Sequence, residues 1–234
     1  MIAIFGRQPD DLLYLESYAE AVGEEIQLPC GLTYRLAKID GVDVILSCAG
    51  ESNYLSAIVL SELFALYPIP HVIKIGDSVS MNADYELGDI VFVDSVYPHA
   101  VNYHGDGYRY GEIPGGIPSV FPCDRSLFPH LQGGETPLKR GALMSGEKAI
   151  YEKGEFDTIM KRRYLYVDNM ALYNPCSYGL ALACHLHQSA FTDLEIVSLK
   201  AGDEEGKLTR KRIALSKAPE LGRLVCKLLE GGQL

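Results

Sequence analysis

The sequence of 234 residues has few basic residues and no long apolar run. Its 21 Lys and Arg residues face 31 Asp and Glu residues, which gives a formal net charge of −10. Such a charge argues against nucleic acid or an anionic membrane surface as a partner, because both would repel it. No apolar run approaches the roughly 20 residues that cross a bilayer. We therefore expect no membrane segment, and a small molecule or another protein chain as the partner.

The six cysteines are scattered along the chain without any CxxC spacing. The chain opens on the strand-like segment MIAIFG, without the basic and apolar regions of a signal peptide. Both features predict a reduced, cytoplasmic protein. His185 and His187 lie two residues apart in a predicted helix, which places them on different faces, so we expect no metal site. We expect no other cofactor.

No linker or low-complexity stretch divides the chain, and 47% of its residues are hydrophobic, which predicts one domain over residues 1–234. Apolar patterns predict strands at 2–5, 32–39, 42–47, 71–75, 89–96, 141–145, 165–167 and 195–199. They predict helices at 10–22, 53–67, 175–187 and 218–230. This alternation is typical of an α/β fold with three layers, in which helices cover a central mixed, mostly parallel sheet.

Two helix starts have recognisable caps. Ser52 or Asn53 caps the second predicted helix, and Asn174 is the expected N-cap of the third, with Pro175 as its first residue. In the second helix the apolar residues repeat at helical spacing and should form its buried side: Leu55, Ile58, Val59, Leu63 and Leu66.

Ligands of such sheets bind beyond the carboxyl ends of the strands, so the turns at those ends are the candidate binding segments. They cover residues 7–11, 50–53, 76–80, 145–151, 168–174 and 202–204. Several of them carry a carboxylate, although one such carboxylate is ordinarily a helix cap or a surface charge. Asp11 is the clearest example, because the macrodipole favours acids in a first helical turn. A long loop rich in Gly, Pro and Tyr, from 97 to about 123, also predicts a functional role.

Two segments of the chain resemble a known family. LGDIVFVDSVYPH (87–99) and GYRYGEIPG (107–115) are similar to the "VGDIV…Y.H" strand and the "GYEYGQLPG" loop of the nucleoside phosphorylase and nucleosidase superfamily. Weaker similarities are AIFGRQPDDL, CAGESNYLSA, KIGDSVS, MSGEKAIY and SLKAGDE. Within the superfamily the chain most resembles bacterial 5′-methylthioadenosine/S-adenosylhomocysteine nucleosidases and the related futalosine hydrolases of menaquinone biosynthesis.

This resemblance implies hydrolysis of the N-glycosidic bond of a purine nucleoside, with release of adenine. Asp203 matches the family's general acid, whose pKa burial should raise. Asp11 matches the acidic residue that orients the attacking water, with Asp10 beside it as an alternative. The positions that would contact the substrate are Gln8, Glu51, Asp77, Ser78, Ala149, Ile150, Tyr151, Asp168, Asn169 and Met170.

The ribose segment departs from the family pattern. Met170 stands where the family has a glutamate that binds the ribose hydroxyls. Asp168, Asn169 or Asn174 would have to replace it, or this segment makes no ribose contact.

The base and glycine-turn segments depart as well. Ala149 stands at the position of a stacking phenylalanine, so base stacking is lost or Tyr151 supplies it. Asp77 replaces a small residue, and Val79 replaces a glycine that lets a ligand approach the backbone.

In the family the aromatic loop crosses to the neighbouring subunit and closes the 5′ end of its site. The resemblance therefore implies a homodimer in which Tyr108 and Pro114 contact the ligand of the partner, with Tyr103 lining the loop. Alternatively, these tyrosines hold the loop against its own domain. Two other functions stay open, a catalytically silent protein that binds a nucleoside or base, and a purine nucleoside phosphorylase. A phosphate nucleophile needs arginines or free backbone amides, and the binding segments offer only Arg7, which favours water.

Overall fold

The computed structural model describes residues 1–99, 101–133, 137–148, 150, 152–164, 167, 169–202 and 206–230. Eleven strands in these ranges form one sheet, in the order β10-β9-β7-β11-β6-β1-β5-β4-β2, with β3 beside β4 and β8 beside β7. Their bounds are β1 Ile2–Gly6, β2 Ala21–Val22, β3 Ile26–Gln27, β4 Thr33–Ile39, β5 Val42–Cys48, β6 His71–Ser80, β7 Ile90–Pro98, β8 Phe121–Pro122, β9 Leu138–Ser145, β10 Met170–Asn174 and β11 Ala190–Lys200.

Four neighbouring strands of the sheet, β5, β1, β6 and β11, run parallel. Every residue of β1 and β6 is buried, because helices cover both faces of the sheet. This burial explains why β1 and the first part of β6 are rich in apolar residues without the alternation of a half-exposed strand. The predicted α/β class with a central mixed sheet is confirmed.

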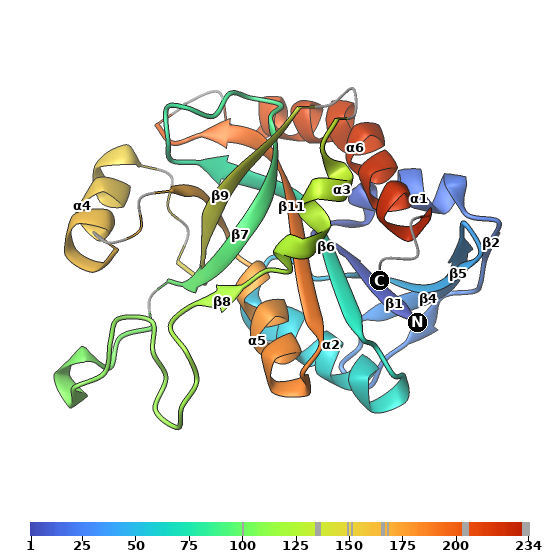
Figure 1. Ribbon diagram of the computed structural model, residues 1–234, viewed down its shortest axis with the longest axis horizontal. Helices are drawn as coiled ribbons and strands as arrows, with labels where there is room; N and C mark the ends of the chain where they lie inside the picture. The colour runs from blue at the N-terminus through green and yellow to red at the C-terminus, as the bar shows by residue number, and fades with distance from the viewer. Residues whose placement is uncertain are drawn as a thin grey trace.

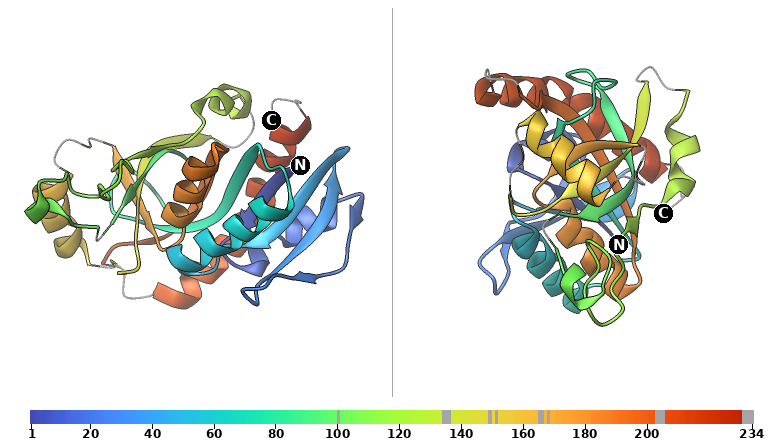
Figure 2. Two further views of the ribbon diagram at one scale, coloured as in Figure 1. Left: turned by 90° about the horizontal axis from the view of Figure 1, so that it is seen from below. Right: turned by 90° about the vertical axis from the view of Figure 1, so that its left-hand side faces the viewer.

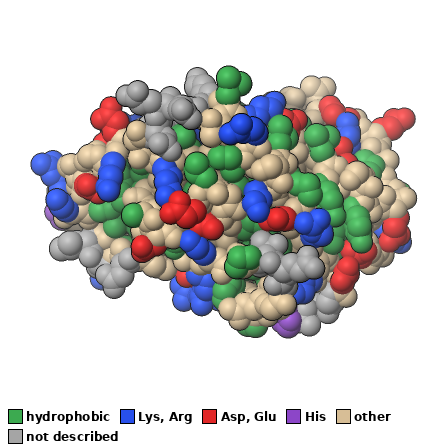
Figure 3. Space-filling view, turned by 90° about the horizontal axis from the view of Figure 1, so that it is seen from above, with side chains coloured by type: hydrophobic (Ala, Val, Ile, Leu, Met, Phe, Trp, Pro, Cys, Tyr) green, Lys and Arg blue, Asp and Glu red, His purple; other side chains and the backbone are tan. Residues whose placement is uncertain are grey.

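The helices lie in two layers around the sheet (Figure 1). One layer contains α1 (Leu13–Tyr18), α3 (Phe128–Leu131) and α6 (Gly206–Glu230), and the other contains α2 (Asn53–Leu66) and α5 (Ser177–His187). Each layer packs on its own buried apolar cluster, and α2 and α5 lie side by side (Figure 2). α4 (Lys153–Arg163) lies at the end of the sheet, where it packs with β9 and β10. The outer face around α6 mixes acidic, basic and apolar side chains (Figure 3).

Side-chain caps fix the starts of α2 and α5. The Ser52 hydroxyl accepts the backbone N–H of Tyr54, which confirms one of the two predicted caps. The N-cap of α5 is Cys176, so the prediction of Asn174 was wrong by two residues. Asn174 nevertheless accepts the N–H groups of Cys176 and Ser177 through its side-chain oxygen, and it therefore supports the same helix end.

The prediction for the buried side of α2 was wrong for three of its five residues. Val59 and Leu63 are buried, but Leu55, Ile58 and Leu66 are 43%, 45% and 56% exposed. Helical spacing identifies an apolar stripe without saying what covers it. Here part of the stripe faces away from the sheet.

Several other helix and strand boundaries differ from those predicted from the sequence. The predicted helix at 10–22 is a 3₁₀ turn, Pro9–Asp11, followed by α1 and β2. The last helix begins at Gly206, well before the predicted residue 218, and it contains Pro219 in its interior. α4 and β10 were not predicted, and residues 165 and 166 of the strand predicted at 165–167 lie outside the described residues.

β10 closes one half of the sheet on itself. It pairs in parallel with β9 and also pairs antiparallel with the end of β6, through Leu172 opposite Ser80 and Tyr173 opposite Val79. Beyond this region the loop between β7 and β8 projects from the body of the molecule, with a short 3₁₀ helix at His104–Asp106 (Figure 1).

Candidate active site

A cavity of about 500 Å³ opens where the predicted ligand-binding edge of the sheet lies. We call it the ion-paired cavity. Its lining comes from the turns after β1 and β5, from β6 and from α6: Arg7, Gln8, Pro9, Asp10, Asp11, Glu51, Asp77, Arg210, Lys211, Ala214 and Leu215. The predicted residues Gln8, Asp11, Glu51 and Asp77 are thus brought together.

Asp11 is buried at the end of the 3₁₀ turn that follows β1. Its carboxylate accepts the backbone N–H of Gln8 at 2.8 Å, and Pro9 fixes the first position of the turn. Burial raises the pKa of Asp11 above its ordinary value, and the hydrogen bond from Gln8 only partly offsets this rise. Asp11 can therefore hold a proton more readily than an exposed aspartate.

Arg7 connects two carboxylates across the cavity. Its guanidinium donates to Glu51 at 2.6 Å and to Asp77, whose side chain is only 1% exposed. Burial opposes the charge of Arg7, but the nearby Asp77, Asp11 and Glu51 outweigh it and raise the arginine pKa. Gln8 also donates to Glu51, at 3.0 Å.

Asp77 accepts hydrogen bonds on both of its oxygens. Arg7 binds one oxygen, while Ser198 and the Nε of Arg210, at 2.6 Å, bind the other. Burial alone would raise the pKa of Asp77, but the charges of Arg7 and Arg210 prevail and lower it. Two carboxyls of the cavity are therefore shifted in opposite directions: burial raises the pKa of Asp11, and the two arginines lower the pKa of Asp77.

A second polar network lies buried beneath this cavity. Lys74 of β6 contacts Glu195 and lies 3.8 Å from Asp193, and all three side chains are fully buried. Burial raises the pKa of Asp193, the largest effect on that group. A Cβ atom on Gly76 would lie 3.2 Å from the Lys74 ammonium and 3.0 Å from the Cβ of Arg7, so a side chain at this position would have to displace both neighbours slightly.

The predicted residue Ser78 belongs to this second network. It is fully buried, its carbonyl accepts the Ser198 hydroxyl at 3.3 Å, and its hydroxyl lies 3.5 Å from the Asn174 amide. Asn174 also donates to Glu195 at 2.6 Å. The network therefore joins β6, β10 and β11 directly behind the cavity.

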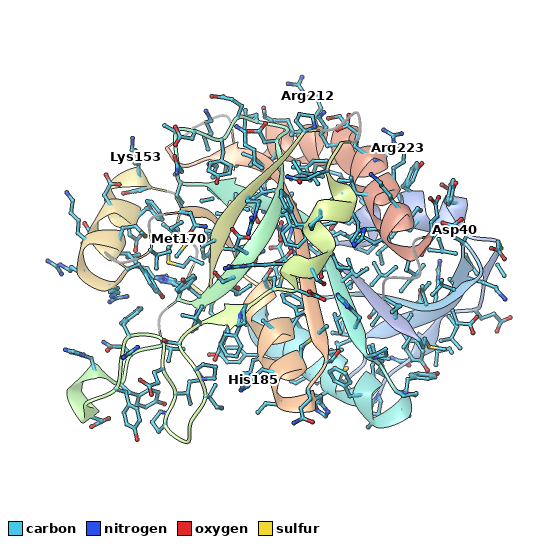
Figure 4. The ribbon with its side chains drawn as sticks, viewed as in Figure 1. Asp40, Lys153, Met170, His185, Arg212 and Arg223 are labelled. Carbon is cyan, nitrogen blue, oxygen red and sulfur yellow. The ribbon has the colours of Figure 1, made fainter. Side chains whose placement is uncertain are left out.

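Three predicted contacts lie away from the ion-paired cavity. Ile150 and Met170 are buried in the apolar cluster between α4, β9 and β10, and Figure 4 shows Met170 near α4. Asn169, at the opposite end of β10 from Asn174, donates to Asp94 at 3.3 Å. The structure therefore does not bring these three residues together with Asp11 in the ion-paired cavity, and their role as substrate contacts stays a prediction.

Four predicted site residues lie outside the described residues: Ala149, Tyr151, Asp168 and Asp203.

The sequence reasoning missed Arg210, Ser198 and the buried Lys74 network. Arg210 belongs to α6, which starts earlier than predicted, and it binds a carboxylate 133 residues away in the sequence. Lys74 carried a usable signal, because a charged residue inside a strand that is apolar on both sides must find a buried partner.

A second cavity, of about 450 Å³, lies between α2, α5 and the projecting loop. We call it the apolar cavity. It is lined by Asn53, Tyr54, Ala57, Ile58, His99, Val101, Ile113, Gly146, Glu147, Tyr178, Gly179 and Leu182. Three of these side chains have buried polar atoms that no described residue binds, namely the Asn53 amide nitrogen, both ring nitrogens of His99 and the Tyr178 hydroxyl.

The loop residues expected at a partner's site lie at the surface. Tyr103 is 43% exposed, Pro114 is exposed and Tyr108 is half-buried. None of the three lines the ion-paired cavity of its own chain.

Within the described residues, no group of three or more His, Cys, Asp or Glu side chains is arranged to hold a metal ion. No helix in this part of the chain combines the length and the apolar character that crossing a membrane requires. All six cysteines are free thiols.

The family model of the phosphorylase superfamily matches residues 2–229. The chain belongs to this superfamily. A 5′-methylthioadenosine/S-adenosylhomocysteine nucleosidase from Hydrogenovibrio crunogenus is 26% identical over 233 residues, 97% of each chain. Two solved nucleosidases share the fold. That from Colwellia psychrerythraea, in complex with adenine, has a TM-score of 0.86 at 20% identity over 100% of this chain and 95% of the other. That from Neisseria meningitidis, in complex with methylthio-immucillin-A, has a TM-score of 0.87 at 17% identity over 98% of both.

Proposed function

We propose that this chain is a purine-nucleoside N-ribohydrolase. The N-glycosidic bond breaks, the oxygen of a water molecule bonds to the anomeric carbon, and a proton passes to the departing base. Membership of the phosphorylase superfamily and the names of the relatives support this reaction. They also support a nucleoside of the 5′-methylthioadenosine or S-adenosylhomocysteine type as the substrate, with adenine as the product. An aminodeoxyfutalosine is a third candidate substrate, proposed from the resemblance of the sequence.

Asp11 is the observation that carries this proposal. A buried carboxyl at the wall of a cavity, with a raised pKa, can orient a water molecule and take its proton near neutral pH. Gln8 and Glu51 are the proposed substrate contacts beside it, and Asp77 holds both arginines in place. We assign the general acid to Asp203 from the family resemblance.

The test is release of adenine from the three candidate nucleosides, followed by chromatography. Asp11→Asn should lower kcat by about 10²- to 10⁴-fold, because it removes the proton acceptor. Asp10→Asn is the matched control, since Asp10 is 43% exposed and pairs with Lys211 at 3.1 Å. Equal losses in both variants would contradict the role of Asp11. Full activity of Asp203→Asn would show that Asp203 is not the general acid, but it would not contradict the proposed hydrolysis.

A separate measurement is needed to decide whether water or phosphate is the nucleophile. The sequence offered only Arg7, but Arg210 also lines the ion-paired cavity, so the charge argument was incomplete. Both arginines are bound to Asp77, which keeps them from a free phosphate. We therefore expect adenine release in phosphate-free buffer at an unchanged rate, and strict dependence on added phosphate would instead indicate a phosphorylase.

We further propose that the protein is a homodimer formed through the apolar cavity and the exposed apolar side chains of α2. Tyr54, Leu55 and Ile58 are 71%, 43% and 45% exposed. Neighbouring exposed apolar side chains of this kind often mark a protein–protein interface. His99 and Tyr178, whose polar atoms are buried without a described partner, line the same cavity. In such a dimer Tyr103, Tyr108 and Pro114 would reach the site of the partner. Sedimentation of a monomer at micromolar concentration would contradict this proposal.

We make two further proposals, on the domain organisation and on the cellular compartment. The family match supports one nucleosidase-like domain over residues 1–234. The six free cysteines support a reducing compartment, and we propose the cytoplasm.

A further inference from the structure

A third cavity, of about 550 Å³, lies between the projecting loop and the last turn of α4. We call it the basic cavity. Its lining is Asn102, His104, Arg109, Tyr110, Arg162 and Arg163. Three guanidinium groups and one imidazole meet there, and no described carboxylate lines the cavity. Because the whole chain carries a formal charge of −10, this concentration of cations is local.

Arg163 is held in a fixed position by aromatic side chains. Its guanidinium lies 4.2 Å from the centre of the Tyr110 ring and donates to the Tyr110 hydroxyl. Tyr110 packs edge-on against Tyr164, which is fully buried and donates to the carbonyl of Pro98 at 2.6 Å. An arginine stacked in this way is already ordered, so binding an anion costs it little further entropy.

Arg109 reaches the same cavity from a loop that is folded by its own hydrogen bonds. Its backbone N–H donates to the Glu112 side chain at 2.9 Å, and the Glu112 N–H donates back to its carbonyl at 3.0 Å. The Gly111 N–H donates to Val101 at 3.0 Å. Neither Arg109 nor Arg162 forms an ion pair with a described residue, so their guanidinium groups are available to a ligand.

The helix macrodipole explains only part of this arrangement. Cations in the last turn of α4 interact favourably with the carbonyl end of the helix, which accounts for Arg162 and Arg163. It does not account for Arg109 and His104, which belong to a different segment. The adjoining cavity on the other side of Arg163 has Glu155 as its only described carboxylate, and Lys148 already pairs with it.

We propose that the basic cavity binds a small phosphorylated molecule that carries at least two negative charges. Guanidinium groups bind phosphate oxygens through paired N–H donors, and a cavity of this size suits a small molecule. Within one chain the site shares no lining residue with the ion-paired cavity.

Calorimetric titration with inorganic pyrophosphate tests this site. We expect binding to the wild-type protein that weakens as salt rises, and at least a ~10-fold loss of affinity in Arg109→Ala/Arg162→Ala. The matched control is Arg212→Ala/Arg223→Ala, which removes the same charge from exposed positions on α6, away from α4 (Figure 4). Its affinity should equal that of the wild-type protein. No binding heat, or equal losses in the two double variants, overturns the proposal.

Two further arms keep the outcome unambiguous. Titration with adenosine diphosphate distinguishes a site for the phosphate groups alone, with the same affinity as pyrophosphate, from one that also takes the nucleoside and binds more tightly. Sedimentation of the double variants detects an acidic protein surface as the true occupant. A change of oligomeric state in Arg109→Ala/Arg162→Ala with unchanged pyrophosphate affinity overturns the proposal. Circular dichroism checks that the variants fold.

Discussion

The ion-paired cavity and the apolar cavity differ in how many of their buried polar groups have hydrogen-bond partners. In the first, Asp77 binds Arg7, Arg210 and Ser198, so the charges of the site are neutralised within one chain. In the second, His99 and Tyr178 have buried polar atoms without a described partner. Buried polar groups are normally bound. In the ion-paired cavity the Nε of Arg7 has no described partner, whereas the apolar cavity has four such buried atoms, on Asn53, His99 and Tyr178. This difference fits our proposals that the ion-paired cavity takes the small molecule and that the apolar cavity belongs to a dimer interface.

Removing the central carboxylate of the ion-paired cavity should have the largest effect on stability. Asp77→Ala leaves Arg7 and Arg210 without their shared partner, and breaking a buried ion pair from one side costs about 3–5 kcal/mol of unfolding free energy. Urea denaturation at pH 7 measures it. A loss below ~1 kcal/mol would mean that solvent already screens the network, and the contrast between the two cavities would fail.

Acid should lower the stability of the folded protein through His99, which lines the apolar cavity. Burial lowers the pKa of His99 to about 4 from an ordinary 6.5. Because the folded value lies below the unfolded one, the contribution of His99 is fully present above pH 6.5 and is lost as the pH falls toward 4. The full loss is roughly 3 kcal/mol for one such histidine.

His99→Phe should therefore flatten the fall in urea stability between pH 7 and pH 4. Part of the fall should remain, since burial also lowers the pKa of His71 to about 4. An identical pH profile in the variant would show that His99 finds a partner, for example from a second copy.

A charge introduced on α2 should weaken the proposed dimer moderately. Ile58→Glu places a carboxylate at the lining of the apolar cavity, and we expect the dissociation constant to rise at least ~10-fold. Leu208→Glu is the matched control on α6, where the side chain is 87% exposed. Sedimentation measures both, and equal behaviour would place the interface elsewhere.

The smallest effect is expected at the rim of the ion-paired cavity. Glu51 is 60% exposed although it binds Arg7 at 2.6 Å. Glu51→Ala should therefore change the unfolding free energy by less than about 1 kcal/mol, because solvent screens such a pair. A larger loss by urea denaturation would show that Glu51 belongs to the buried network with Asp77.

The sequence predicted the parts of the fold that depend on local pattern. Apolar runs identified β1, β5 and β6, and Ser52 located the start of α2. It failed where the outcome depends on distant packing. The last helix was predicted from residue 218 although α6 begins at Gly206, and the apolar stripe of α2 was assigned to the core although part of it is exposed.

The same distinction applies to the candidate site. Gln8, Asp11 and Glu51 follow strands and Asp77 lies in the second half of β6, so the topology rule brings them together. Arg210 joins them through the packing of a helix far along the chain, which no local pattern reveals. Met170 was placed by resemblance, yet it lies in an apolar cluster near α4.

The pairing of β10 with β6 has a consequence for the order of folding. Ser80 and Val79 meet Leu172 and Tyr173, and Asp77 meets Arg210, so both contacts join the two halves of the chain. Contacts of such long sequence separation form slowly. On the ribosome the ion-paired cavity cannot assemble until nearly the whole chain has emerged. A nascent protein should therefore be inactive until synthesis is almost finished.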